Sequence, residues 1–360
     1  MKKVLTYLFT LISSLGVFGQ RVDLDKYNFS ANYVDLPRMV IDTSFKTYFV
    51  EIDASAALKN HLVGENLLES IHIDGWKKLS EKAHVKIFTR LEDVFIENVE
   101  VKERVEILKD KDGKETGRRN YFYVQLIYTF EAEAEVSDYK GNPIITFTLA
   151  NRDDRQTYKT QEFSSFIEAS LYFKFRGVDF TKEIAKRAAR NAINYLSYEM
   201  TVNYGYTAST VNDFLWILDS RKHPEYDAHR KAWIVFKQAM FRMSAEEPVD
   251  EIRQSLIPVI NYYESIKKRY SSNRKADRKI RYASYFNLAK LYYYLDDADA
   301  AMREAGELML NEFDEKDGRR LESAATELKM LLKQNKFTSR HFPLQTEKYK
   351  GPEVISMNQQ

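Results

Sequence analysis

The sequence contains no cysteine, and this absence excludes three kinds of chemistry. The chain can form no disulfide, offers no thiol nucleophile and lacks the acylated cysteine of a bacterial lipoprotein. Its stability must therefore come from buried surface, and 360 residues are enough for one or two complete cores.

Catalytic motifs are also missing. There is no H-E-x-x-H zinc motif, no G-x-S-x-G nucleophile elbow and no glycine loop for phosphate. Glu225 and His229 share a helical face and could begin a metal site, although a helix start explains this segment more simply. Glu131 and Glu133 could act as acid and base on a glycan, or simply face solvent from a strand. We expect no cofactor, no metal site and no enzymatic activity.

An excess of charge of either sign is missing too. The whole chain has 55 basic and 53 acidic residues, and Lys2 and Lys3 account for the difference. A balanced chain has no overall field to draw it onto nucleic acid or anionic lipid. We therefore expect no nucleic-acid partner, and contact with an acidic surface would need a local patch.

Residues 1–19 have the pattern of a cleavable signal peptide. Lys2 and Lys3 precede a mostly apolar run from Val4 to Val17, and a cut before Gln20 fits the small-residue rule. The run is short for a membrane span, so an uncleaved anchor is the weaker alternative. We expect a periplasmic protein without a direct membrane span, or alternatively an extracellular one.

An extended segment at residues 20–44 is expected to lead into a β-rich α+β domain at residues 45–202. Apolar residues alternate with polar ones on both sides of the charged segment 109–117, which predicts a long hairpin. A second hairpin is predicted to turn at residues 139–142, and shorter strands at 47–53 and 84–90. These strands predict an antiparallel sheet of about five or six strands with one buried face.

The apolar period changes to that of a helix after Gly177. Ile184, Ala188, Ala192 and Leu196 recur at helical spacing, so we predict a helix that begins at Asp179 or Thr181 and covers the sheet. In element order alone, this domain resembles envelope proteins of the curli-secretion and penicillin-binding-protein-activator type.

Residues 208–335 predict an all-α domain, and residues 336–360 a flexible tail. Short connections between helices of similar length favour antiparallel neighbours stacked in series. The predicted helices are 210–218, 224–243, 248–270, 276–295, 298–311 and 318–333.

Residues 282–313 resemble a tetratricopeptide repeat (TPR). The residues that carry the resemblance are Tyr285, Leu288, Ala289 and Tyr292 on the first helix, and Ala301, Ala305 and Leu308 on the second. The chain departs from the family pattern at Asp296, which stands in place of the usual turn glycine. The resemblance implies that the domain binds another protein or peptide in a groove lined by Asn287, Lys290 and Tyr294. Two hairpins that merely stabilise the β-rich part are the alternative.

A basic segment extends from Lys267, at the end of the predicted helix 248–270, to Arg281. Its candidate binding residues are Lys267, Lys268, Arg274 and Lys275, with tyrosines on either side. Such a segment could contact an acidic or phosphate-bearing envelope surface, or form a solvated connection between helices.

The sequence thus predicts an α+β protein: an antiparallel β-rich domain with a covering helix, followed by TPR-like helical hairpins. The function that fits best is an exported, non-catalytic adaptor or scaffold of the bacterial cell envelope, whose partner is another envelope protein or peptide. The alternative is a secreted or periplasmic enzyme or binding protein that acts on glycans or peptidoglycan.

Overall fold

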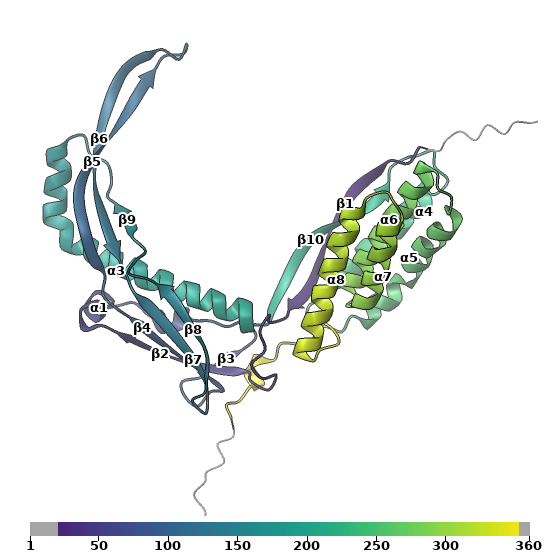
Figure 1. Cartoon of the computed structure of the whole chain (residues 1–360), viewed down its shortest axis with the longest axis horizontal. Helices are drawn as coiled ribbons and strands as arrows, with labels where there is room; N and C mark the ends of the chain where they lie inside the picture. The colour runs from purple at the N-terminus through teal and green to yellow at the C-terminus, as the bar shows by residue number, and fades with distance from the viewer. Residues whose placement is uncertain (1–20, 353–360) are drawn as a thin grey trace, which may run out of the picture. The chain divides into compact units, whose positions relative to one another are not determined.

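The computed structural model describes residues 21–352, so the predicted signal peptide lies outside the described residues. The chain forms two compact units. The helical unit comprises residues 21–34 and 208–343, and the sheet unit comprises residues 35–207 and 344–352 (Figure 1). The α+β class is confirmed. No helix within residues 21–352 is long and apolar enough to cross a membrane.

Two predicted boundaries are wrong because both chain ends are shared between the units. The expected extended segment 20–44 contains a strand of the helical unit as far as Val34, and only the rest belongs to the sheet unit. The expected flexible tail is divided in the same way at Pro343. Residues 336–343 of this tail belong to the helical unit, and the side chains of Arg340 and His341 are buried there.

The sheet unit contains a five-stranded sheet in the order β3-β2-β4-β7-β8. The strands are β2 (Thr47–Ala54), β3 (Lys77–Lys78), β4 (Val85–Leu91), β7 (Ala132–Asp138) and β8 (Pro143–Ala150). The β4–β7 and β7–β8 pairs are antiparallel, and the second predicted hairpin is confirmed. The parallel β2–β4 pair was not predicted. Two short helices, α1 (Ala56–His61) and α2 (Leu67–Ser70), lie in the connection between β2 and β3.

A three-stranded sheet holds the long predicted hairpin. Its strands are β5 (Phe95–Lys109), β6 (Glu115–Thr129) and β9 (Gln156–Lys159) in the order β5-β6-β9, and both pairs are antiparallel. At the tip, the Asp110 carboxylate accepts hydrogen bonds from the backbone of Asp112 and Lys114. Gly113 adopts φ 80°, which suits a residue without a Cβ.

The covering helix, α3 (Phe166–Tyr204), is longer than predicted. Its N-cap is Ser165, whose hydroxyl accepts a hydrogen bond from the Glu168 backbone, so the predicted start at Asp179 or Thr181 is wrong. Gly177 lies inside the helix and does not interrupt it. The predicted apolar stripe is buried at Ile184, Ala188, Ala192 and Leu196.

The helical unit contains five long helices among its described residues, close to the predicted ranges from residue 224 onward. They are α4 (Tyr226–Arg242), α5 (Asp250–Arg269), α6 (Lys275–Tyr294), α7 (Ala298–Leu310) and α8 (Glu315–Asn335). A short 3₁₀ turn, η1 (Thr346–Lys348), lies in the sheet unit. Large apolar side chains of α4, α5 and α6 form the main core, among them Phe236, Tyr263 and Leu291.

The predicted helix 210–218 is wrong, because these residues belong to strand β10 (Thr207–Leu218). Its partner is β1 (Leu24–Asp35), and the two form a ribbon on the helices (Figure 1). Ser30 meets Asn212 and Asn32 meets Thr210, so the strands run in opposite directions. Alternate residues such as Phe29, Leu215 and Ile217 enter the helical core. This segment is rich in β-branched and aromatic residues, which favour a strand. Their burial against the helices stabilises the strand more than the weak helical spacing would stabilise a helix.

Candidate partner-binding surface

The predicted groove residues of α6 face strand β10. Asn287 is fully buried, and its side chain accepts a hydrogen bond from the Trp216 backbone N–H at 2.9 Å and donates one to the Trp216 carbonyl at 2.8 Å. A side-chain amide that bonds both the N–H and the carbonyl of one residue replaces the backbone of a neighbouring strand as its hydrogen-bond partner. Asn287 thereby fixes the position of β10 on the helices.

Lys290 and Tyr294 both contact the Asp213 carboxylate of β10. The Tyr294 hydroxyl donates to Asp213 Oδ2 at 2.6 Å, and the Lys290 ammonium forms an ion pair with the same oxygen. Burial and the neighbouring carboxylate raise the pKa of Tyr294, so the phenol remains a donor. The expectation that these residues line an open groove is therefore corrected, because a strand of the same chain occupies their face.

Ion pairs within the unit engage part of the predicted basic segment. Lys267 lies 2.8 Å from carboxylate oxygens of both Glu264 and Glu304. Burial lowers the pKa of Lys267, but these two carboxylates outweigh it and the pKa is raised. Arg274 pairs with Asp277 in the first turn of α6. Lys268 and Lys275 are exposed, so the outward charge of this segment is smaller than the sequence indicates.

Contacts within the helical unit hold Glu225 in place at the start of α4. Its buried carboxylate pairs with Arg269 at 2.7 Å and accepts hydrogen bonds from the hydroxyls of Tyr262 and Tyr270. Burial and this carboxylate raise the pKa of Tyr270 to about 12. His229 is fully enclosed, and burial lowers its pKa to about 3. No group of three or more potential metal ligands occurs among residues 21–352.

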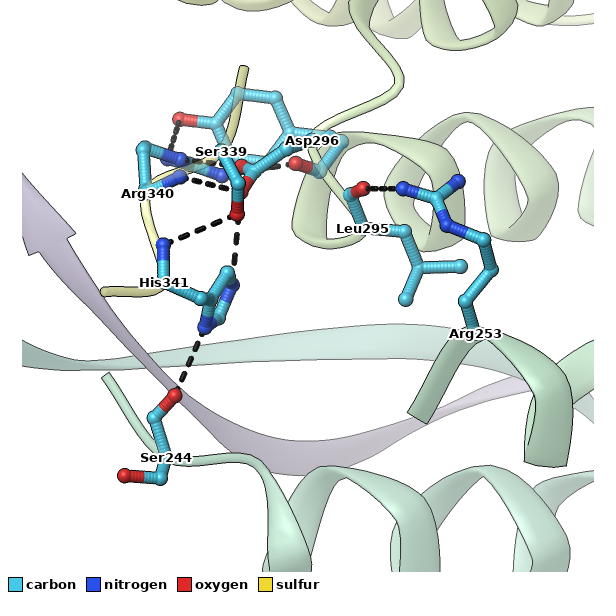
Figure 2. Close-up of polar contacts among 8 residues, drawn as sticks. Ser244, Arg253, Leu295, Asp296, Ser339, Arg340 and His341 are labelled. Atoms are coloured by element: carbon cyan, nitrogen blue, oxygen red, sulfur yellow. Dashed lines mark hydrogen bonds and ion pairs between the residues drawn. The ribbon is translucent and has the colours of Figure 1, made fainter. Parts of the chain in front are cut away.

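Sequence reasoning missed a buried ionic cluster around Asp296, shown in Figure 2. Asp296 lies in the turn between α6 and α7 with φ 59°, a left-handed conformation that glycine adopts more readily. Its Oδ1 accepts from Arg340 Nε at 2.7 Å, and Oδ2 accepts from the Arg340 backbone N–H at 2.6 Å and from the Ser339 hydroxyl at 2.9 Å. The side chains of Asp296 and Arg340 are only 1% and 4% exposed.

Residues 339–341 act as a strap over this turn. The Arg340 guanidinium donates to the Tyr293 carbonyl at 2.8 Å and stacks over the ring of Tyr33 on β1. Burial lowers the pKa of Arg340, but Asp296 and the neighbouring tyrosines outweigh it and the pKa is raised. His341 Nδ1 lies 2.8 Å from the Ser244 carbonyl, and its Nε2 lies 3.7 Å from Asp296 (Figure 2). The strap therefore joins the α6–α7 turn, β1 and the end of α4.

The Asp296 carboxylate is occupied by the strap, whereas capping of α7 falls to Asp297, whose side chain accepts from the Ala300 backbone. A cavity of about 210 Å³ adjoins the strap between α4 and α5. Its walls include Arg242, Glu247 and Glu251, together with His341. The departure from the TPR pattern at Asp296 was the available signal, although its partner Arg340 lies too far along the chain to be paired by spacing.

The outward face of α3 in the sheet unit carries an exposed apolar stripe that the sequence reading missed. Ile167, Leu171, Phe175 and Val178 are 68%, 47%, 79% and 81% exposed. They recur at three- or four-residue intervals and so lie on one side of the helix. We call these four residues the α3 stripe. The opposite side packs inward through Ala169 and Phe180.

Comparisons with known proteins assign no family. No protein-family model and no curated protein matches the sequence. Among solved structures, the chain matches the solution NMR structure of uncharacterized lipoprotein B from Nitrosomonas europaea. Sequence identity is 13% and the TM-score is 0.18, and the match covers 47% of this chain and 97% of that one. A likeness at this level defines neither the fold nor the function.

Proposed function

We propose that this protein is an exported, non-catalytic partner-binding protein of the bacterial cell envelope that acts in the periplasm. The signal-peptide pattern of residues 1–19 supports export. The TPR resemblance supports a binding role, since the α6–α7 hairpin buries the small residues Ala289 and Ala301 where the family brings helices together. Because β10 covers the groove face of α6, the partner must use another surface.

The observation that carries this proposal is the α3 stripe. Soluble proteins rarely leave several large apolar side chains exposed in one continuous row, and such rows mark interaction sites. Phe175 and Val178 are its most exposed members, and each is about four-fifths exposed. An aromatic and a branched aliphatic side chain of this exposure are typical anchors of an interface core.

Charge near the α3 stripe favours a protein partner over a lipid surface. Three basic residues, Lys174, Arg176 and Lys182, are balanced by three acidic ones, Glu168, Asp179 and Glu183. Arg176 pairs with Asp179 at 2.8 Å. Helices that lie on anionic membranes carry a basic polar face, which this segment lacks. An apolar helix or strand face of another envelope protein matches the stripe better.

The test is a paired substitution with a matched control. Phe175→Ser with Val178→Ser should abolish stoichiometric crosslinking to one envelope protein in intact cells, whereas Phe241→Ser should not, although Phe241 of α4 is 90% exposed. Direct binding of the purified partner should show the same difference.

Two results would contradict the proposal. One is equal partner capture by the stripe variant and the control. The other is stripe-dependent binding to vesicles of phosphatidylglycerol and phosphatidylethanolamine in the absence of any protein. Cell fractionation tests the location separately, and a cytoplasmic protein that retains Lys2 and Lys3 would refute export.

A further inference from the structure

A pocket in the sheet unit has the chemistry of a small-ligand site. Its volume is about 290 Å³, and residues at the ends of β6 and β8, in the β8–β9 connection and on α3 line it. Ligand sites of proteins range from about 300 to 1,000 Å³. A pocket at the lower end of this range suits one ring rather than an extended chain.

Small residues of α3 leave the space for this pocket. Ala188 and Ala192 form its helical wall, and both are buried. Tyr128 and Phe130 form an aromatic floor and are also buried. A larger residue at either alanine position would fill the volume, so the pocket depends on the choice of alanine at these two sites.

The rim of the pocket is polar and carries no basic residue. Asn151, Asp154 and Gln156 contribute from the β8–β9 connection and the start of β9, and Asn191 and Tyr195 contribute from α3. All five are exposed at the surface. Amide groups both donate and accept hydrogen bonds, and a carboxylate accepts them.

These features select among ligand classes. The lack of lysine or arginine and the presence of Asp154 disfavour a phosphate or carboxylate ligand. A purely apolar ligand would strip water from the polar rim without replacing its hydrogen bonds. A sugar ring satisfies both parts, because its C–H face packs on aromatic side chains while its hydroxyls pair with amides and a carboxylate.

We propose that this pocket binds a single sugar ring, either a free monosaccharide or the terminal residue of a glycan. Tyr195 would pack on the ring, and Asn191 and Asp154 would pair with its hydroxyls. The pocket uses residues of α3 from Ala188 onward, so it is distinct from the α3 stripe. The proposal is independent of the protein partner.

The test uses the full mature chain and titration calorimetry, with glucose, galactose, mannose and N-acetylglucosamine as separate probes. At least one should bind with a Kd of about 1 mM, as expected for a one-ring ligand. Tyr195→Ala and Asn191→Ala should each weaken that binding by about tenfold. Tyr198 is a more exposed tyrosine of the same helix that lies outside the pocket, and Tyr198→Ala should change the binding by less than about twofold.

A second titration separates the two sources. If the natural ligand is a glycan end, an oligosaccharide that ends in the bound sugar should bind more tightly than the free sugar. If it is a monosaccharide, the two should bind equally, and either result supports the proposal. Absence of saturable binding by all four sugars would overturn it. So would equal losses in Tyr195→Ala and Tyr198→Ala proteins that both retain their circular dichroism spectra.

Discussion

Replacement of Arg340 by alanine tests whether the strap holds the helical unit together. The change leaves the Asp296 carboxylate buried and without its cation, while the Tyr293 carbonyl loses a donor. Removal of one partner of a buried ion pair costs about 3 to 5 kcal/mol of unfolding free energy. For a unit of about 150 residues, this corresponds to a fall in Tm of roughly 6 to 20 °C.

A second variant separates the buried charge from the lost packing. Asp296→Asn combined with Arg340→Ala removes both charges, and asparagine tolerates the left-handed backbone at φ 59°. The double variant should be more stable than Arg340→Ala alone by about 1 to 3 kcal/mol, because no unpaired charge remains buried.

The assay is urea unfolding followed by tryptophan fluorescence, since Trp216 and Trp233 lie in the helical unit. The matched control is Arg319→Ala, which removes an exposed ion pair with Glu315 and should cost less than about 1 kcal/mol. If Arg340→Ala proves no less stable than Arg319→Ala, the strap does not stabilise the helical unit, and residues 339–341 belong to the flexible tail that the sequence predicts.

Two further predictions concern the interior of the helical unit. Asn287→Ala should lower the free energy of unfolding by about 2 to 4 kcal/mol, because both backbone groups of Trp216 lose their partner; loss of partner binding with unchanged urea stability would instead support an open groove. Burial depresses the pKa of His229 in the folded protein to about 3. Below the unfolded pKa of about 6.5, the unfolded chain binds one more proton than the folded chain, so stability falls as the pH is lowered. Between pH 8 and pH 5 this loss should be about 2 kcal/mol, and it should vanish in His229→Asn if the histidine is its source; an equally steep pH profile in that variant would assign the loss to other groups.

Local patterns predicted the fold well wherever neighbours in sequence are also neighbours in space. The hairpin through Gly113 and the helices of the all-α part are examples, since alternation and helical spacing act within a few residues. Strand β10 was missed because it forms only by pairing with β1. The two strands are far apart in sequence, and Asp23 and Ser220 at their ends are 197 residues apart. Pairing at that distance leaves no periodic signal.

The candidate site shows the same division. Asn287, Lys290 and Tyr294 were correctly grouped on one face, but the sequence could not show that Asp213 and Trp216 of the same chain occupy it. The α3 stripe was missed because the helix was predicted to begin at Asp179 or Thr181, after the last residue of the stripe. The hydroxyl of Ser165 starts the helix earlier, and the chain between the two positions then becomes a helical surface.

The ribbon of β1 and β10 has a consequence for the order of folding. During synthesis from the amino end, β1 is made early, yet its backbone partner at Val34 is the carbonyl of Arg340, near the opposite end of the sequence. The helical unit therefore cannot close until nearly the whole chain has been synthesised. Contacts of such high sequence separation slow folding and leave apolar strand faces uncovered in the meantime. A chaperone that covers the apolar face of β1 would protect the chain from aggregation during that interval.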